Sequence, residues 1–369
     1  MTRAAIMETA REPLVIVDDL EVEGPGHGEV LVDVTHCGLC HSDLHLLDGS
    51  MPFPVPAVLG HEAGGVVAEV GPGVAGLEPG DLVMLTARPP CRRCYFCVRG
   101  QPSLCAESPE VGTGTLIDGT TRLSHRGRRV FRGVGLAGLA GQVVVRATGA
   151  VKVPPTTSMA VAAVAGCALQ TGVGAVLNTA NVEPGSTVLV VGLGGIGVSV
   201  AQGARLAGAS RIIGVDPLPA RRRLATERFG VTDALDPAHT DTVSAVMDLT
   251  AGIGVDYAFE AVGRVPLIEA ALASTRAGGT TILVGVTGIE EVLAIPALFF
   301  TVAEKRLLGC FLGSCDPARD LPRIIELWQA GRLDLDAMVT GVRPLGEVNE
   351  AFADLAAGTG LRTVMDLRA

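Results

Sequence analysis

The stretch from Thr187 to Gly197 constrains the fold of this chain more than any other. It begins with the apolar run TVLVV, continues with the glycines of a G-x-G-x-x-G pattern, and is followed by a helix-like segment at 198–207. The pattern alone is weak support for a structure, but a strand before it and a helix after it are the context that it requires. Glycines permit a tight turn and let the backbone approach a pyrophosphate at the N-terminus of the helix. We therefore predict a βαβ unit whose turn holds a dinucleotide through Gly192, Gly194, Gly195 and Gly197.

An acidic residue after the second strand narrows the choice of dinucleotide. The run at 211–215 is strand-like, and Asp216 follows it, 19 positions after Gly197. A carboxylate there accepts hydrogen bonds from the adenosine ribose hydroxyls and repels a 2′-phosphate, which favours NAD over NADP. Three arginines at 221–223 point the other way, because an arginine nearby can accept that phosphate. With the acid present, we predict NAD.

Length and the order of the segments predict two domains. A chain of 369 residues exceeds what one hydrophobic core usually serves. Strand-like runs near 233–235, 255–259 and 280–285 alternate with helical segments, which predicts a doubly wound parallel sheet. The part before this sheet is rich in short strands and turns. It lacks an obvious closing partner, so we expect the tail from about residue 300 to fold back onto it.

Composition excludes several classes of function. The net charge is −10, so no basic surface for nucleic acid is expected, and His125 and the arginines at 126–132 are interpreted as exposed. No signal peptide is recognisable, and no apolar run reaches about 18 residues without a charge or a glycine, which predicts a cytoplasmic protein without a membrane span. In that reducing compartment, nine cysteines favour metal or catalytic roles over disulfides.

Four cysteines in a polar loop give the most specific local pattern. They are spaced C-x2-C-x2-C-x7-C in a segment rich in proline, arginine and glycine, and they are Cys91, Cys94, Cys97 and Cys105. Four thiolates on a lobe with little apolar content suit tetrahedral Zn²⁺ in a closed structural site. An iron–sulfur cluster also takes four cysteines at short spacings and is the alternative. The metal would supply stability that hydrophobic burial cannot.

A second set of metal ligands is spread along the chain. Cys40, His61 and Cys167 offer two thiols and an imidazole, a set that leaves an open position on zinc for water or substrate. Cys37 and Cys40 also match a redox C-x-x-C and, with His41, a haem attachment motif. No export signal supports haem attachment, and no thioredoxin-like unit surrounds the pair. Cys37 is therefore interpreted as a small core residue.

With these motifs assembled, the chain resembles the zinc-containing medium-chain alcohol dehydrogenases over nearly its whole length. The family signature G-H-E-x2-G-x5-G-x2-V matches residues 60–74, and the cysteine loop and the G-L-G-G-I-G turn match as well. The resemblance implies an α/β fold, with a GroES-like β-rich catalytic domain and a Rossmann domain built on a doubly wound parallel sheet. The implied boundaries are a catalytic domain at 1–167 with the cysteine lobe near 88–108, an NAD-binding domain at 168–311, and a second catalytic segment at 312–369.

The resemblance also implies a catalytic zinc in addition to the structural one. Cys40, His61 and Cys167 would hold it. Glu62 would lie close to this ion or touch it transiently, and Asp43 would orient His61 from behind. Two zinc ions per chain and NAD are therefore the implied cofactors.

Further residues receive roles from the resemblance alone. Ser42 and His45 resemble the family's proton relay. The residues implied to contact NAD, besides the turn glycines, are His41 and Arg362 at the pyrophosphate, Thr171 and Ile196 at the nicotinamide, and Asp216 and Arg221 at the adenosine ribose.

The activity that the resemblance implies is the reversible oxidation of primary or secondary alcohols to aldehydes or ketones, with hydride transfer to NAD. Zinc would act as a Lewis acid, and the proton would leave through Ser42, the nicotinamide ribose and His45. Ala87 and the glycine-rich segment 133–142 stand where many relatives carry bulkier residues, which suggests a wide apolar pocket for medium-sized alcohols. The particular substrate is left open.

Other functions remain alternatives. Glutathione-dependent formaldehyde dehydrogenases are close relatives, but Met51 and Pro109 stand where charged residues would hold their anionic thiol adduct. Many polyol dehydrogenases use Glu where this chain has Cys167. A nicotinoprotein with tightly held NAD, or a zinc-stabilised NAD-binding protein without turnover, would share the motifs. The long segment 112–135 resembles that of dimeric relatives, so a homodimer is predicted, with a tetramer as the alternative.

Overall fold

The computed structural model describes residues 1–369 and divides into two compact units. The terminal unit, named for the chain ends that it contains, comprises Met1–Cys167, Asp316–Gln329 and Leu335–Ala369. The central unit comprises Ala168–Cys315 and Ala330–Asp334. The two sets of predicted metal ligands lie in the terminal unit, and the glycine-rich turn lies in the central unit.

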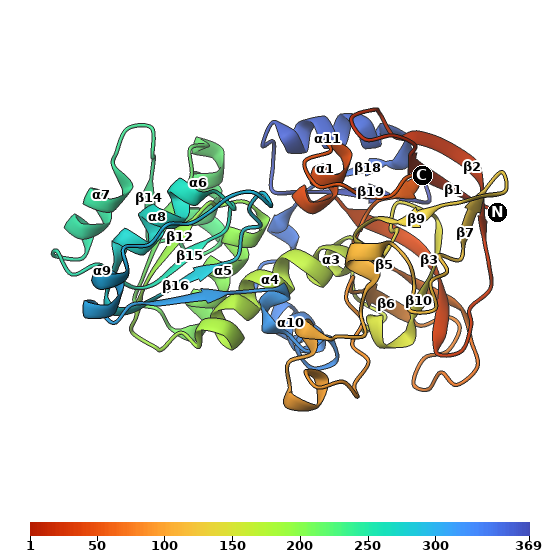
Figure 1. Ribbon diagram of the computed structural model, residues 1–369, viewed down its shortest axis with the longest axis horizontal. Coiled ribbons are helices and arrows are strands. Elements are labelled where there is room, and N and C mark those ends of the chain that lie inside the picture. Colours follow the sequence, from red (N-terminus) through yellow and green to blue (C-terminus); the bar gives the residue numbers. More distant parts are fainter. The chain divides into compact units, whose positions relative to one another are not determined.

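The largest sheet of the terminal unit is built around β3, which pairs antiparallel with β5, β10 and β19 (Figure 1). The tail contributes β18 and β19 to it, and Met365 of β19 lies opposite Cys37 of β3. The tail thus supplies the partner strand that the N-terminal strands lacked, because β19 pairs with β3. The strands of this sheet are β3 (Glu29–Gly38), β5 (Glu62–Val70), β6 (Leu82–Leu85), β10 (Gln142–Arg146), β11 (Ala150–Lys152), β18 (Val339–Pro344) and β19 (Arg362–Asp366).

A second sheet of the terminal unit has the order β8-β7-β2-β1-β4-β9. It packs on the same hydrophobic core, to which Ile6, Leu20, Val32 and Leu59 contribute fully buried side chains. Its strands are β1 (Thr2–Met7), β2 (Val15–Val22), β4 (Ala57–Val58), β7 (Leu123–His125), β8 (Arg128–Arg129) and β9 (Phe131–Arg132). The helices of the terminal unit are α1 (His41–Leu47), α2 (Glu110–Thr113), α3 (Met159–Val164), α10 (Pro317–Gln329) and α11 (Val348–Ala356).

The segment 123–142 differs from its expected exposure. His125 is buried, and its Nε2 lies 2.9 Å from Oδ1 of Asp19. Three arginines of the cluster are exposed as expected, but Arg132 is 1% exposed, and burial lowers its pKa to about 10. Leu136 and Leu139 belong to the hydrophobic core. The Leu139 carbonyl accepts a hydrogen bond from the N–H of Ala5 in β1, and its N–H donates one to the carbonyl of Leu59, which follows β4. These side chains therefore pack the core rather than line a wide pocket.

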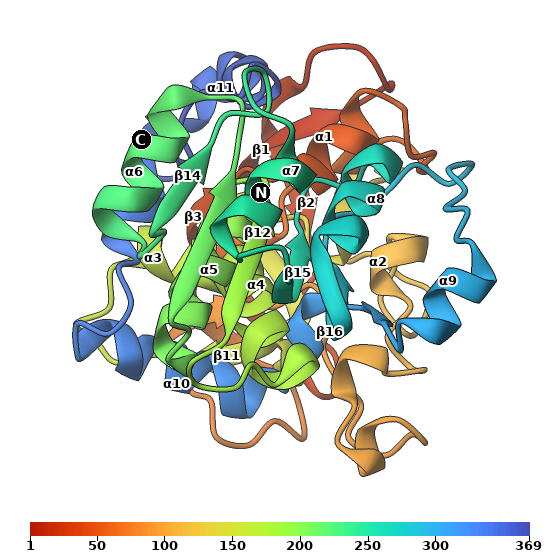
Figure 2. The ribbon, with the colours of Figure 1, turned by 90° about the vertical axis from the view of Figure 1, so that its left-hand side faces the viewer.

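The central unit is a doubly wound sheet of six parallel strands, as predicted (Figure 2). Its order is β14-β13-β12-β15-β16-β17, which reverses direction beside β12 as in dinucleotide-binding folds. β12 has a continuous apolar run because helices cover both faces of such a sheet. The strands are β12 (Thr187–Val191), β13 (Arg211–Val215), β14 (Asp233–Leu235), β15 (Val255–Glu260), β16 (Thr275–Leu283) and β17 (Arg306–Gly309). The helices are α4 (Gln170–Gly174), α5 (Gly195–Ala207), α6 (Pro219–Arg228), α7 (Thr242–Leu249), α8 (Val265–Ser274) and α9 (Ala297–Val302).

The helical stretch Met159–Ala180 is interrupted by a π turn at Ala165–Leu169 and ends in a second one at Ala175–Ala180. It is long and apolar enough to cross a membrane by length and composition, but 89% of its most apolar window is buried inside the structure. A core helix passes the same test, so this stretch is weak support for a membrane span. The first π turn contains Cys167, and such turns frequently occur at functional sites.

Candidate active site and metal centres

The ends of β3 and β5 bring together four potential metal ligands. Gly38, the last residue of β3, pairs with Glu62, the first residue of β5. Cys40 follows β3 in an extended conformation as the N-cap of α1, and His61 directly precedes β5. The ligand atoms of Cys40, His61, Glu62 and Cys167 all lie within 4.8 Å of one another, and all four residues are buried. We refer to these four residues as the mixed cluster.

The carboxylate of Asp43 holds the imidazole of His61. Asp43 Oδ2 lies 2.9 Å from His61 Nδ1, and Oδ1 accepts a hydrogen bond from the Gly60 backbone N–H at 2.8 Å. With Nδ1 engaged, Nε2 is the nitrogen left for a metal. Gly60 has φ +92°, and a Cβ there would lie 2.6 Å from Sγ of Cys37, so this junction requires glycine.

Burial and mutual charge set the protonation of the mixed cluster. A hydrogen bond from the Cys167 thiol holds the pKa of Cys40 well below its usual range, with help from the Arg362 guanidinium. The same hydrogen bond, together with burial, raises the pKa of Cys167. Burial alone lowers the pKa of His61, but Asp43 and Cys40 outweigh it, and the net shift is upward. One thiolate is thus favoured already, and a bound cation would favour ionising the second.

Arg362 lies against the mixed cluster. The sequence predicted a contact of this arginine with the pyrophosphate, but not its contact with Glu62 and Cys40. Its Nη2 lies 3.5 Å from Oε1 of Glu62 and 4.0 Å from Sγ of Cys40. Burial raises the pKa of Glu62 to about 8, although the guanidinium opposes that shift. Neither carboxylate oxygen of Glu62 has a hydrogen-bond partner, although both are buried. The Arg362 guanidinium compensates one of these oxygens at ion-pair distance, and a cation held by the neighbouring sulfurs and imidazole would complete the compensation of this buried carboxylate.

One further polar residue of α1, Ser42, lies close to the mixed cluster. Ser42 Oγ lies 3.9 Å from Sγ of Cys40. His45 is half-buried and its Nδ1 lies 3.1 Å from Oγ of Ser50. Residues three apart on a helix share a face, so Ser42 and His45 lie on the same side of α1. His41, at the start of the helix, is exposed.

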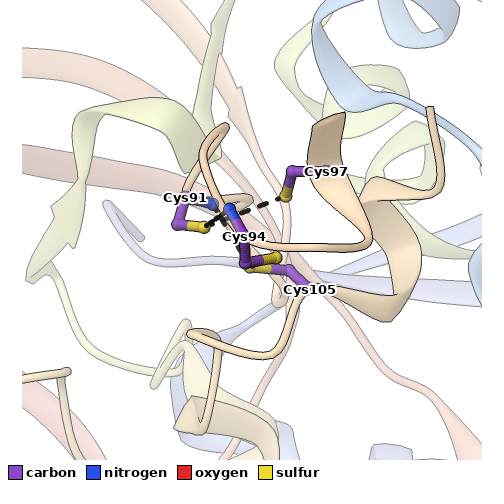
Figure 3. A group of neighbouring side chains, drawn as sticks. All are labelled: Cys91, Cys94, Cys97 and Cys105. Carbon is purple, nitrogen blue, oxygen red and sulfur yellow. Dashed lines mark hydrogen bonds between the residues drawn. The ribbon is translucent and has the colours of Figure 1, made fainter. Parts of the chain in front are cut away.

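The cysteine lobe, residues 88–108, forms a second candidate metal centre. Figure 3 shows its four cysteine side chains turned toward one another, and their sulfur atoms all lie within 4.8 Å. Two of the sulfur pairs, Cys91 with Cys97 and Cys94 with Cys105, are separated by 3.9 Å. Ligands at the usual Zn–S distance of about 2.3 Å in a tetrahedron are about 3.8 Å apart. The spacing of the sulfurs therefore fits zinc.

A partly buried arginine fastens both ends of this lobe to β10. Arg146 donates hydrogen bonds to the Pro89 carbonyl at 2.5 Å and to Oγ of Ser108 at 3.1 Å. Its Nε lies 2.6 Å from Oε1 of Glu110, and the Ser108 hydroxyl donates to Oε2 of the same carboxylate at 3.0 Å. Sequence reasoning missed this clamp, because no motif or periodicity links Arg146 to partners so distant in the chain.

The glycine-rich turn between β12 and α5 has little room for side chains. Gly192 has φ +90°, and a Cβ on Gly197 would collide with the carbonyl oxygen of Gly192. A Cβ on Gly194 would meet only the Arg221 guanidinium, at 3.7 Å, so this side of the turn is open. The turn therefore combines tight backbone packing with an accessible face at the N-terminus of α5, as a pyrophosphate site needs.

Asp216 is tied to this turn. Its Oδ2 accepts a hydrogen bond from the Leu193 N–H and its Oδ1 accepts one from the Leu218 N–H, both at 2.9 Å. Each carboxylate oxygen has two lone pairs, so acceptor capacity for ribose hydroxyls remains. Arg221 Nη1 lies 3.9 Å from Oδ2, so the acid and one of the arginines stand together after β13.

The two residues expected at the nicotinamide lie on neighbouring helices. Thr171 is buried in α4, and Ile196 is half-buried in the first turn of α5. A Cβ on Gly172 would lie 2.6 Å from the carbonyl oxygen of Ile196, so the two helices approach each other closely at this level. The tight packing holds both residues beside the glycine-rich turn.

Comparison with known proteins identifies the class to which this fold and these clusters belong. The family model described as alcohol dehydrogenase GroES-like domain matches residues 26–155, and the one described as zinc-binding dehydrogenase matches residues 195–330. The chain belongs to the zinc-containing medium-chain alcohol dehydrogenase family and is an oxidoreductase. The predicted family, fold class and reaction class are therefore confirmed: zinc-dependent oxidation of small-molecule alcohols, in a family that uses NAD.

Particular relatives span nearly the whole chain. It is 39% identical over 371 aligned positions to the S-(hydroxymethyl)glutathione dehydrogenase of Escherichia coli O1:K1 / APEC, covering 99% of both chains. A solved alcohol dehydrogenase zinc-binding domain protein from Burkholderia ambifaria shares 33% identity with a TM-score of 0.94, over 99% of this chain and 98% of that one. The benzyl alcohol dehydrogenase of Acinetobacter calcoaceticus shares 29% identity with a TM-score of 0.93, over 99% of each chain.

Proposed function

We propose that the mixed cluster is the catalytic zinc centre of an enzyme that oxidises primary or secondary alcohols with NAD, and that the cysteine lobe holds a second, structural zinc. The cluster itself carries this proposal: four buried ligand atoms lie within 4.8 Å of one another. Two sulfurs and one imidazole form a donor set that zinc takes where it keeps a position open for substrate. Four sulfurs form the closed set of structural sites.

The chain's own residues would orient the reactants and move a proton. Zinc in the mixed cluster would supply Lewis-acid polarisation of the substrate oxygen, and NAD would accept the hydride. Ser42, beside Cys40, would take the hydroxyl proton of the substrate and at the same time give up its own hydroxyl proton. His45, on the same face of α1, would pass that proton to solvent, and the reverse reaction would return it.

Replacement of Ser42 tests this proton path. Ser42→Ala should lower kcat by about 10²-fold, because a positioned proton acceptor typically contributes at least that much. The zinc content should stay unchanged, since Ser42 is not among the clustered ligands. Unchanged turnover in this variant would remove Ser42 from the path.

NAD is the proposed cofactor because Asp216 stands at the end of β13 with acceptor capacity left. Arg221 beside it is the reason to test NADP as well. His41 and Arg362 remain the proposed pyrophosphate contacts. Arg362 would then link NAD to Glu62, since its guanidinium already lies 3.5 Å from that carboxylate.

An uncharged primary or secondary alcohol is the proposed substrate. A second candidate is a thiol adduct of formaldehyde, because the Escherichia coli relative at 39% identity is an S-(hydroxymethyl)glutathione dehydrogenase. Met51, 42% exposed, and Pro109 offer no charge to hold such an anionic adduct. For that reason the uncharged alcohol is favoured.

A homodimer in the cytoplasm is the proposed state. Strand β17 forms one edge of the central sheet, and an edge strand offers unpaired backbone groups to a second copy. Large exposed apolar side chains near this edge in sequence support an interface: Val286, Ile289, Val292, Leu298, Phe299 and Val302. All nine cysteines are free thiols, which suits a reducing compartment.

An activity panel combined with metal analysis tests the whole proposal. Uncharged alcohols and S-(hydroxymethyl)glutathione would be assayed with NAD and with NADP, and zinc would be quantified per chain. We expect turnover of uncharged alcohols with NAD and two zinc ions per chain. Turnover of the glutathione adduct alone would favour the second candidate, and one zinc without turnover would contradict the catalytic centre.

A further inference from the structure

A serine outside α1 contacts the imidazole of His45 on one side. The helix ends at Leu47, and the chain turns through Asp48 and Gly49, which has φ +73°. Ser50 then returns toward the helix. Its Oγ lies 3.1 Å from Nδ1 of His45 and 3.3 Å from the carbonyl oxygen of the same residue.

The returning turn is held by its own backbone hydrogen bonds. The Ser50 N–H donates to Oδ1 of Asp48 at 2.8 Å, and the Met51 N–H donates to the His45 carbonyl at 2.9 Å. These bonds fix Ser50 at two points beside the last turn of α1. The serine hydroxyl therefore meets His45 in a defined geometry, although Ser50 itself is exposed.

Both contacts of the hydroxyl are satisfied by one arrangement of protons. A serine hydroxyl has one hydrogen and two lone pairs, and a carbonyl oxygen only accepts. The contact with the His45 carbonyl therefore uses the serine hydrogen. The contact with Nδ1 must then be an N–H donated by the imidazole to a lone pair of Oγ. In a neutral imidazole with Nδ1 protonated, Nε2 is bare and is the basic nitrogen.

We propose that Ser50 is a positioning residue of the proton path, which holds His45 in the Nδ1–H tautomer so that Nε2 is the base. The proposal rests on the relay role given to His45 above. Nε2 takes the proton, the ring becomes an imidazolium whose Nδ1–H still bonds Oγ of Ser50, and Nε2 then releases the proton to solvent. Without the serine, a share of the rings carries the hydrogen on Nε2 and cannot accept a proton there.

Steady-state kinetics test the coupling between the two residues. A general base contributes about 10²-fold or more, so Ser50→Ala, which only redistributes the tautomers, should lower kcat by about 3- to 10-fold. Ser50→Thr keeps the hydroxyl and should restore most of the loss. In a His45→Ala background, Ser50→Ala should cause no further loss. Ser124→Ala is the control, since it removes a partly exposed hydroxyl of the terminal unit that bonds a carboxylate, here Oε2 of Glu21 at 2.7 Å.

Nitrogen-15 NMR of the histidine rings gives a second readout that does not depend on activity. The chain has seven histidines, and the His45 signals are those lost in His45→Ala. At about pH 9, where an ordinary imidazole is neutral, His45 should show a pyrrole-type Nδ1 and a pyridine-type Nε2. Ser50→Ala should move the ring toward the opposite tautomer.

Two results would overturn the role of Ser50. One is a pyridine-type Nδ1 of His45 in the unmodified enzyme. The other is an equal loss from Ser50→Ala with and without His45, which would mean that the serine acts only through the fold. An unmodified enzyme that oxidises no alcohol would contradict the proposed function instead, and the NMR result would still decide the tautomer.

Discussion

The two candidate metal centres of the terminal unit bring their ligand atoms within 4.8 Å of one another by opposite routes. The cysteine lobe takes all four ligands from 15 consecutive residues, Cys91 to Cys105, and three of its cysteines are partly exposed. The mixed cluster takes its ligands from the end of one strand, the start of another and a π turn, and all four are buried. The first set depends on local chain geometry, and the second depends on the packed sheet.

This difference predicts different functions for the two metals. A lobe of short turns has little core of its own, so its metal would supply folding stability. The mixed cluster lies at the ends of paired strands that a hydrophobic core holds in place. Its metal would therefore not be needed for folding and would act in catalysis. The charged groups near the two centres agree with this division. The mixed cluster includes an ionisable carboxylate, Glu62, and has Arg362 beside it, whereas the lobe offers only sulfur atoms.

The sharpest test of the comparison is loss of a ligand from the mixed cluster. Cys40→Ser should lower kcat by about 10³-fold or more, because the Lewis acid is lost or misplaced. Zinc should fall from two ions per chain to one, and the melting temperature should change little because the core remains. Metal analysis, kinetics and thermal unfolding would be measured on one preparation. Full activity with one zinc would make the mixed cluster unnecessary for catalysis.

Loss of a ligand from the lobe should produce the opposite pattern. Cys97→Ser should also remove one zinc, but its main effect should be on stability, with a melting temperature lower by about 10 °C. That figure assumes a loss of about 3 kcal/mol and about 2–4 °C per kcal/mol for a unit of this size. Activity measured well below the new melting temperature should be largely kept. A variant that is stable but inactive would assign this zinc to the chemistry.

A smaller effect is expected behind the mixed cluster. Asp43→Asn keeps the shape of the side chain but removes the charge beside Nδ1 of His61. Zinc affinity at the mixed cluster should fall by about 10- to 100-fold, as for other carboxylates that orient a histidine ligand. Competition with a chelator would measure it, with the lobe zinc as an internal reference. Equal weakening of both zincs would show that the effect is general unfolding.

The smallest effect concerns the central unit, which contains neither cluster. Asp216→Ala should raise the KM for NAD by about 10-fold, since a lost hydrogen bond to ribose hydroxyls is worth about 1.4 kcal/mol. The gap between NAD and NADP should narrow because the acid no longer repels a 2′-phosphate, while Arg221 remains. Both zincs should stay bound. A preference for NADP in the unmodified enzyme would contradict the assignment of Asp216.

Much of the fold was predictable because its signals are local. The apolar run of β12, the glycines after it and the acid after β13 are read from short stretches, and the central sheet follows from their alternation. The burial of His125 and Arg132 was not predictable in this way. The burial of each side chain depends on groups that other strands bring near it. Composition contains no information about such distant groups.

The sequence by itself determined which residues are predicted as the two sets of ligands and as the dinucleotide turn, since thiol spacing, the G-H-E pair and the glycines are fixed by residue type and order. Tertiary structure decided what surrounds them. It brought Cys167 to Cys40 through a π turn, set Arg362 from the last strand against Glu62, and clamped the lobe with Arg146. The physical reason is separation along the chain: local spacing restricts neighbours a few residues apart, whereas contacts between distant segments exist only once the sheets and their core have formed.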